Sequence, residues 1–244
     1  MKLLIDIGNT RIKWCVEKNE VLGKGNVIVH QQTDFIQQIQ LAWLNLDTPN
    51  ILVISCVSNQ QIVEQLISLA ETLWPNIKVM VAKSTAQAGG LSNAYPKANT
   101  LGVDRWLGLI ALQYFYSGNS CVVDCGTAIT IDMINQQGQH LGGLICPGLQ
   151  LMKQSLSAGT ARLSNSDQDF DVGLANSTES AIYSGALYAA AGLIEKSIAD
   201  FSTCQTVVIT GGDGGIIAKH LNLDCIVDTD FILKGLSLYS KQRA

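Results

Sequence analysis

Apolar residues along the chain form two kinds of segment, which follow one another in turn. Short, continuous apolar runs bounded by Gly, Asn or Pro are typical of buried strands. Such runs occupy residues 2–7, 12–16, 27–29, 51–57, 77–82, 121–124, 129–134 and 206–210. Apolar residues at helical spacing, or long Ala-rich apolar segments, predict helices over residues 35–46, 60–74, 104–116, 149–156 and 179–201. The order of these elements predicts an α/β protein with mixed sheets flanked by helices.

One segment departs from both patterns. Residues 83–100 are rich in Gly, Ser, Asn and Ala and contain Pro96, which is the composition of a loop. Long loops inside compact enzymes are usually functional. We therefore expect this segment to contribute to a binding site.

The opening pattern of the chain occurs a second time. Residues 3–9 read LLIDIGN and residues 121–127 read CVVDCGT, and each is followed by another apolar strand. Internal similarity of this kind indicates a duplicated fold. We expect two related lobes, residues 1–117 and residues 118–244.

Both copies carry residues that suit phosphate binding. Asp6 ends an apolar run, and Gly8 follows in a turn whose backbone N–H groups can approach phosphate oxygens. Thr10 and Lys13 can add donors, and Asp6 can hold Mg²⁺. A single motif of this kind is more often an ordinary hairpin turn, since Asp and Gly are the usual turn residues. The second copy favours phosphate binding, and the glycine-rich residues 210–214 after a third strand suit an adenosine.

Composition and charge restrict the partners. With 47% hydrophobic and 15% charged residues the chain is expected to fold, and its net charge of −4 is spread without a basic stripe for nucleic acid. The first apolar run is too short for a signal peptide, and polar residues interrupt the uncharged stretch 106–123. We expect a cytoplasmic protein without a membrane span.

Seven cysteines without a Cys-x-x-Cys pair predict reduced core thiols, and the three histidines are expected at surfaces or turns.

Three sequence motifs restrict the protein families to which the chain can be compared. The order of residues 6–13, 124–130 and 210–214 resembles the actin, Hsp70 and sugar kinase superfamily. The motifs GVDRW at residues 102–106, DCGTA at 124–128 and GGxIxPG at 142–148 look like type III pantothenate kinase. The resemblance extends over nearly the whole chain and implies two lobes of ribonuclease H-like type with a nucleotide cleft between them. Val103 departs from the family, which more often has Ala there, and the change narrows the expected pocket.

The resemblance also implies an activity and a set of site residues. The activity is transfer of the ATP γ-phosphate to the primary hydroxyl of pantothenate, giving 4′-phosphopantothenate, the first step of coenzyme A biosynthesis. Asp104 matches the catalytic base, Asp124 the site of a monovalent cation, K⁺ or NH₄⁺, and Asp6 a site for Mg²⁺. Thr178 reaches pantothenate from the partner subunit of a homodimer. The ATP contacts fall on Asp6, Ile7, Gly8, Asn9, Thr10, Arg11, Ile12, Lys13 and Thr127, and the pantothenate contacts on Tyr95, Gly102, Val103, Asp104, Arg105 and Thr178.

Several alternatives stay open at this point. Asp104 and Arg105 suit proton acceptance and carboxylate binding, but also an ordinary helix N-terminus. Tyr95 is either a wall of the substrate site or a loop anchor. The helix over residues 179–201 suits a dimer face as well as a core position. The alternative functions are a superfamily kinase of another small acceptor, an ATP-binding regulatory protein, and a filament or chaperone, for which the chain is short.

Overall fold

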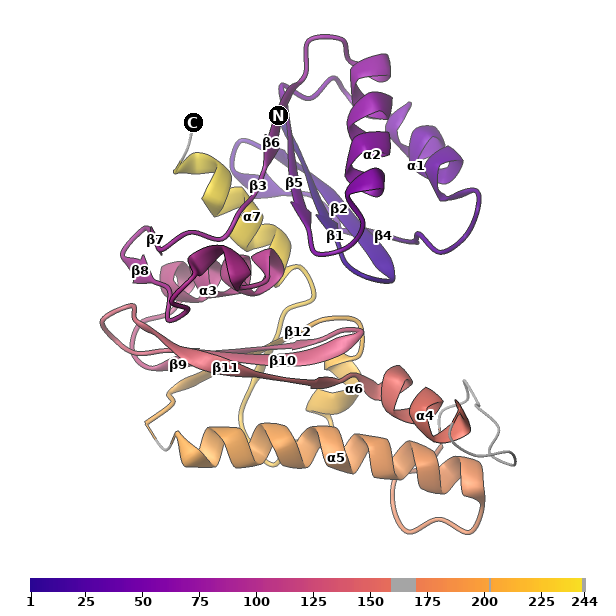
Figure 1. The fold of residues 1–244 in the computed structure, drawn as a ribbon, viewed down its shortest axis with the longest axis vertical. Coiled ribbons are helices and arrows are strands. Elements are labelled where there is room, and N and C mark those ends of the chain that lie inside the picture. The colour runs from indigo at the N-terminus through magenta and orange to yellow at the C-terminus, as the bar shows by residue number, and fades with distance from the viewer. Residues whose placement is uncertain (159–169, 202, 243–244) are drawn as a thin grey trace. The chain divides into compact units, whose positions relative to one another are not determined.

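The computed structural model describes residues 1–158, 170–201 and 203–242 (Figure 1). The chain divides into two compact units, residues 1–115 with 230–244 and residues 116–229. The expected boundary differs in one respect, because it assigned the last 15 residues to the second lobe. Their helix, α7 (Phe231–Lys241), packs instead on the sheet of the first unit and on α3 (Val103–Phe115). A Cβ atom on Gly235 would overlap the carbonyl of Leu107, so the two helices meet at their backbones.

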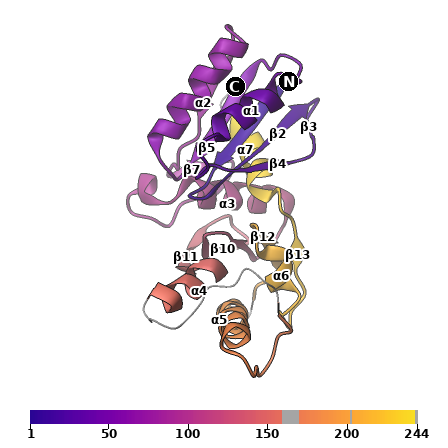
Figure 2. The ribbon, with the colours of Figure 1, turned by 90° about the vertical axis from the view of Figure 1, so that its right-hand side faces the viewer.

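The first unit is a mixed sheet with helices on both faces (Figure 2). Its strand order is β3-β2-β1-β5-β6, and β4 also pairs with β2; β1 is antiparallel to β2 and parallel to β5. The strands are β1 (Lys2–Ile7), β2 (Arg11–Lys18), β3 (Val21–Leu22), β4 (Asn26–Val29), β5 (Ile51–Cys56) and β6 (Lys78–Val81). Helices α1 (Phe35–Trp43) and α2 (Gln60–Leu73) cover the face that carries Leu3, Ile5 and Ile7.

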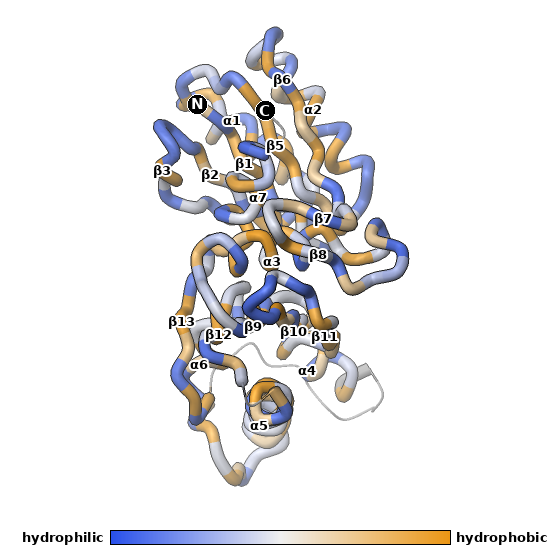
Figure 3. The backbone as a smooth tube through the Cα atoms, turned by 90° about the vertical axis from the view of Figure 1, so that its left-hand side faces the viewer, coloured by the Kyte–Doolittle hydropathy of each residue, from blue (hydrophilic) through white to orange (hydrophobic). Residues whose placement is uncertain are grey.

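Aromatic packing fixes these helices on the sheet. The ring of Trp43 on α1 lies 6.5 Å from that of Trp14 on β2 and stacks at 5.7 Å on that of Trp74. Aromatic pairs at such distances stabilise a core by about 0.5–1.5 kcal/mol beyond their buried area. The central strands are correspondingly apolar along the backbone tube of Figure 3.

The second unit repeats this design. Its sheet has the order β11-β10-β9-β12-β13, with β9 antiparallel to β10 and parallel to β12. The strands are β9 (Ser120–Cys125), β10 (Ala128–Ile134), β11 (His140–Pro147), β12 (Thr206–Thr210) and β13 (Ile226–Val227). A core of mostly aliphatic side chains separates this sheet from α5 (Thr178–Asp200), which runs along it in Figure 1. Helices α4 (Leu149–Ala158) and α6 (Gly214–Ala218) pack on α5.

The two sheets share strand order and strand direction. In each, the first strand lies at the centre between an antiparallel hairpin partner and a parallel strand that arrives later in the chain. The repeated sequence at residues 3–9 and 121–127 therefore corresponds to a repeated fold. The mixed α/β class with sheets flanked by helices is confirmed.

Several elements lacked a prediction from the sequence. They are β3, β11, β13, α6 and α7, together with the short pieces β7 (Gln87–Ala88), β8 (Leu91–Ser92) and a 3₁₀ turn (Ala98–Thr100) inside the expected loop. Strand β11 was missed because Gly142 and Gly143 interrupt its apolar residues, and Gly142 has a φ of 113°. Within the described part of the chain, no helix is both long and apolar enough to cross a bilayer.

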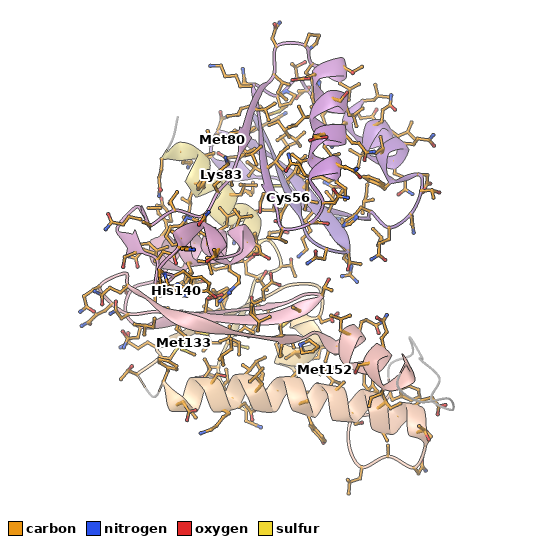
Figure 4. The ribbon with its side chains drawn as sticks, viewed as in Figure 1. Cys56, Met80, Lys83, Met133, His140 and Met152 are labelled. Carbon is orange, nitrogen blue, oxygen red and sulfur yellow. The ribbon has the colours of Figure 1, made fainter. Side chains whose placement is uncertain are left out.

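The sequence also predicted the environments of the cysteines and histidines. All seven cysteines are free thiols; Cys15, Cys121 and Cys125 are buried, whereas the other four, which were expected in the core, are half-buried. His140 corrects the expectation of a surface or turn role. Its ring nitrogen Nε2 lies 3.0 Å from Oδ1 of Asp132, and both side chains are buried. Figure 4 shows His140 on one side of the sheet and Met133 on the side that faces α5.

Candidate active site

The turn between β1 and β2 is held in place by hydrogen bonds around Gly8. Its N–H donates to the carbonyl of Arg11 at 3.0 Å, and a ring nitrogen of His30 lies 2.9 Å from its carbonyl oxygen. A Cβ atom on Gly8 would approach the Arg11 carbonyl to 3.3 Å, so the turn favours glycine. Asn9 and Arg11 are exposed, and the backbone of this turn is therefore accessible to a ligand.

Asp6 lies at the penultimate position of β1, on the face opposite the core residues Ile5 and Ile7. Its cross-strand partner is Lys13 on β2, and its parallel neighbour on β5 is Ser55. Burial raises the pKa of the nearby Cys56 thiol, and the negative charge of Asp6 raises it further. A carboxylate with a lysine as cross-strand neighbour suits a bound phosphate and its divalent cation.

A hollow of about 440 Å³ lies in the first unit beside this strand end. It is formed where β5 and β6 end and α3 begins, and Cys56 and Lys83 mark the two strand ends in Figure 4. Its lining mixes apolar and polar groups: Cys56, Val57, Ala82, Lys83, Ser84, Asn99, Thr100, Leu101, Gly102 and Val103. Only Gly102 and Val103 of these were predicted, because the others belong to segments that the sequence does not connect. The volume suits a small polar molecule.

Asp104 lies in the first turn of α3, directly after Gly102 and Val103, which line this hollow. Its Oδ1 accepts a hydrogen bond of 2.7 Å from the backbone N–H of Arg105. A Cβ atom on Gly102 would come within 2.6 Å of the same oxygen, so the glycine leaves room for the carboxylate. The helix N-terminus stabilises the ionised form. An ionised, half-buried carboxylate beside a hollow can accept a proton from a bound alcohol.

Arg105 connects α3 to the long loop. Its Nη1 donates a 2.9 Å hydrogen bond to the hydroxyl of Tyr95, and its guanidinium carbon lies 5.6 Å from the centre of that ring. Arg105 is 7% exposed although it is charged. A buried guanidinium is costly unless it is paired, and its planar fork is suited to a carboxylate. The structure therefore brings together Tyr95, Gly102, Asp104 and Arg105, which the sequence predicted as substrate contacts.

The equivalent carboxylate of the second unit lies in a close-fitting cradle. Asp124 is the penultimate residue of β9, and its parallel neighbour on β12 is Thr210. Gly211 has a φ of 91°, and a Cβ atom there would overlap Oδ1 of Asp124 and the backbone of Cys125. A Cβ atom on Gly126 would lie 3.5 Å from the same carboxylate oxygen. The sequence placed Asp124 at a cation site, but it assigned Thr210 to the glycine-rich segment expected to bind adenosine.

The loop after β9 is also braced. Thr127 is exposed, and its carbonyl accepts a 2.9 Å hydrogen bond from the N–H of Gly148. A side chain on Gly148 would overlap the carbonyl of Gly126, which explains the glycine before α4. The glycine-rich segment after β12 is tied to this loop, because the N–H of Asp213 donates to the carbonyl of Cys125 at 2.9 Å.

Thr178 lies apart from these loops in the chain, at the first position of α5. Ser177 caps the helix, and its hydroxyl accepts a 3.3 Å hydrogen bond from the N–H of Ser180. Thr178 itself is exposed. The capped helix start presents the Thr178 hydroxyl on the surface of the second unit.

The side chains around Asp6 and Asp124 determine which cations could bind there. The described residues contain no group of three His, Cys, Asp or Glu side chains that could hold a metal alone. Asp6 and Asp124 instead each have one neighbouring hydroxyl, Ser55 and Thr210, that is fully buried and has no hydrogen-bond partner. Buried hydroxyls without partners are costly. A cation held by a carboxylate, a hydroxyl, water and phosphate oxygens fits both positions.

Comparisons with known proteins agree with this arrangement. Residues 2–200 match the family described as type III pantothenate kinase. A type III pantothenate kinase of Nitrosococcus oceani is 36% identical, covering 99% of this chain and 94% of the relative, and one of Pseudoalteromonas translucida is 35% identical, covering 98% and 96%.

Solved structures show the same fold. A Campylobacter jejuni protein described as a proposed Baf family transcriptional activator has a TM-score of 0.63 at 26% identity, covering 99% of this chain and 98% of that one. Component A of the (R)-2-hydroxyglutaryl-CoA dehydratase of Acidaminococcus fermentans has a TM-score of 0.56 at 13% identity, covering 100% and 99%. The latter likeness concerns the fold alone.

Proposed function

Because the chain belongs to the type III pantothenate kinase family, we propose that it transfers the γ-phosphoryl group of ATP to the primary hydroxyl of pantothenate. The products are ADP and 4′-phosphopantothenate, the first intermediate toward coenzyme A. The observation that carries the proposal is the group formed by Asp104, Arg105 and Tyr95. The first two follow in α3 directly after Gly102 and Val103 of the 440 Å³ hollow, and Tyr95 is hydrogen-bonded to Arg105. We further propose that the enzyme works in the cytoplasm.

In this mechanism, the hollow beside Gly102 and Val103 binds pantothenate. Arg105, oriented by Tyr95, pairs with the carboxylate of the substrate. Asp104 accepts the proton of the attacking hydroxyl as the bond to phosphorus forms and the bond to the ADP oxygen breaks. Phosphoryl transfer needs mainly positioning and charge neutralisation, so one carboxylate of this kind is sufficient on the acceptor side.

The donor side uses the two glycine turns. Residues 6–13 of the first unit and Thr127 of the second bind the ATP phosphates through backbone N–H groups, the Thr10 hydroxyl and Lys13. Asp6 would hold Mg²⁺ directly or through water, Asp124 would hold K⁺ or NH₄⁺, and the two cations would supply charge neutralisation at the phosphates. Both carboxylates lie next to a fully buried hydroxyl that has no hydrogen-bond partner, which supports cation binding at both.

The homodimer is part of the proposal. The second unit exposes several large apolar side chains on β11, on α4 and its flank, and on α5: Leu144, Ile145, Leu151, Leu156, Leu174 and Tyr188. These elements are contiguous, because α4 packs on both β11 and α5. The outer face of α5 also carries Gly185 and Gly192, where an added Cβ would meet nothing within 4 Å. Small residues allow close helix contact, so this face suits a second copy of the chain.

An acceptor panel tests the proposal. Purified protein is incubated with Mg²⁺-ATP and, separately, pantothenate, pantothenol, pantetheine and glycerol, and phosphorylated products are identified by mass spectrometry. We expect phosphopantothenate as the main product and much slower turnover of pantothenol, which lacks the carboxylate. Preferred turnover of another acceptor would make the chain a related kinase, and ATP binding without any transfer would make it a nucleotide-dependent regulator.

A further inference from the structure

The duplicated fold places a hydroxyl beside each of the two carboxylates at the strand ends. Ser55 is the parallel neighbour of Asp6, and Thr210 is the parallel neighbour of Asp124. Residues in register on adjacent parallel strands point to the same face of a sheet. The alternating Val207 and Ile209 of β12 belong to the core on the α5 side, so Thr210 faces the opposite side with Asp124.

Both hydroxyls are in an unfavourable position without a ligand. Ser55 and Thr210 are 0% exposed, and among the residues that the structure describes neither hydroxyl oxygen has a hydrogen-bond partner. A buried polar group without a partner costs about 1–3 kcal/mol. Valine would fill the Thr210 position in an apolar strand at no such cost. The hydroxyl therefore indicates an interaction that the protein chain alone does not supply.

The surroundings of Thr210 identify the class of that partner. The carboxylate of Asp124 is enclosed by Gly211 and Gly126, at positions where a side chain would overlap or contact it. The register of β9 and β12 thus places carboxylate and hydroxyl oxygens next to each other, close to the backbone of Cys125. Carboxylate, hydroxyl and carbonyl oxygens without nitrogen or sulfur are the ligand set of a hard, weakly hydrated cation such as K⁺.

We infer that the Thr210 hydroxyl is a direct oxygen ligand of the monovalent cation at Asp124. The inference rests on the proposed function for the presence of that cation. The hydroxyl supplies a neutral oxygen, so it adds coordination without further negative charge, which suits a singly charged ion. It also explains why the sheet tolerates a buried hydroxyl at this place.

The test measures potassium binding without relying on activity. The thermal midpoint of unfolding is followed as KCl replaces tetramethylammonium chloride at constant ionic strength, with Mg²⁺ and a non-hydrolysable ATP analogue present. Four proteins are compared: the parent, Thr210→Val, Thr210→Ser and Ser55→Ala. The last removes the equivalent buried hydroxyl from the other unit.

We expect the midpoint of the parent to rise with KCl, and the half-saturating KCl concentration of Thr210→Val to increase roughly tenfold, because one ligand is lost. Thr210→Ser should bind K⁺ like the parent, and Ser55→Ala should keep the potassium response of the parent. Without K⁺, Thr210→Val should unfold at the same or a higher temperature than the parent, because a partnerless buried hydroxyl has been removed.

Two results would overturn the inference. One is a folded Thr210→Val protein with the half-saturating KCl concentration of the parent. The other is a parent protein without any potassium-specific shift, which would remove the cation from this position. Pantothenate-dependent ADP formation is measured separately on the parent, so failure of the kinase assignment is distinguished from failure of the ligand assignment.

Discussion

The guanidinium of Arg105 and the hydroxyl of Tyr95 are joined by a 2.9 Å hydrogen bond, which connects the first turn of α3 to the long loop before it. Arg105 is almost fully buried, so its orientation depends on such partners. Tyr95 takes no part in the proposed reaction itself. Through this hydrogen bond it determines where the positive charge of Arg105 lies in the proposed substrate site. We therefore propose that Tyr95 acts as a positioning residue for Arg105.

Replacing Tyr95 by phenylalanine tests this role. The ring stays but the hydrogen bond to the charged guanidinium is lost, at a cost of about 1.5 kcal/mol. We expect the KM for pantothenate to rise roughly tenfold with little change in kcat. Steady-state kinetics measure both values. Tyr114→Phe is the control, because Tyr114 is an exposed tyrosine on α3, the helix that carries Arg105, and an unchanged KM in Tyr95→Phe would contradict the role.

Gly211 is expected to be intolerant of a side chain. Its φ of 91° disfavours any other residue, and an added Cβ would overlap Asp124 and Cys125. We predict that Gly211→Ala lowers the free energy of unfolding by about 2 kcal/mol or more, since strained backbone alone costs about 1–3 kcal/mol. Urea denaturation measures the change. Gly215→Ala, where an added Cβ has nothing within 4 Å, should be close to the parent; equal effects would refute the explanation.

The stability of the first unit should depend on alkaline pH through Cys15. Burial, with the charges of Asp230 and Glu17, raises the pKa of this thiol from 9.0 to about 12. Between pH 9 and 12 the unfolded chain loses the proton while the folded protein keeps it, so stability falls as pH rises. One proton corresponds to a slope of about 1.4 kcal/mol per pH unit.

The measurement is the free energy of unfolding at pH 8, 9, 10 and 11 for the parent and for Cys15→Val. Other groups titrate in this range in both proteins, so the difference between the two slopes is the informative quantity. We expect the variant to lose less stability than the parent between pH 9 and 11. Parallel curves would show that Cys15 ionises equally in both states.

The proposed dimer surface can be tested on α5. Gly185→Arg places a long charged side chain on the exposed small-residue face of the helix, and we expect light scattering to report a monomer at micromolar concentration. Because Thr178 begins the same helix and is proposed to act across the dimer, pantothenate turnover should fall as well. Gln65→Arg, on the exposed face of α2, is the control and should stay dimeric. A dimeric Gly185→Arg protein would place the interface elsewhere.

The sequence predicted the strands and helices whose formation depends on local residue patterns. The two Asp-Gly turns follow continuous apolar runs, and the repeat therefore predicted both central strands and the α/β class. The strand β11 and helix α7 escaped prediction for different reasons. Two glycines interrupt β11, whereas α7 depends on distant partners, β1, β5 and α3, that are remote in the sequence.

The same distinction holds for the site. Asp6, Asp104 and Asp124 stand in motifs and could be located from the sequence alone. Ser55 had no predicted role and Thr210 was predicted only as part of the adenosine segment, because the strand register alone shows which hydroxyl lies beside a carboxylate. The lining of the hollow likewise comes from three segments that only the fold brings together.

Pantothenate-dependent ADP formation by the purified protein is the most direct test of the proposed kinase activity. The rate is measured with Mg²⁺-ATP, with and without pantothenate, for the parent and for Asp104→Asn, whose nucleotide binding is checked separately by calorimetry. We predict ADP formation that requires pantothenate and falls by about a thousandfold in the variant, with ATP binding retained. ADP formation that ignores pantothenate, or that survives in Asp104→Asn, would contradict the assignment of this chain's acceptor and base.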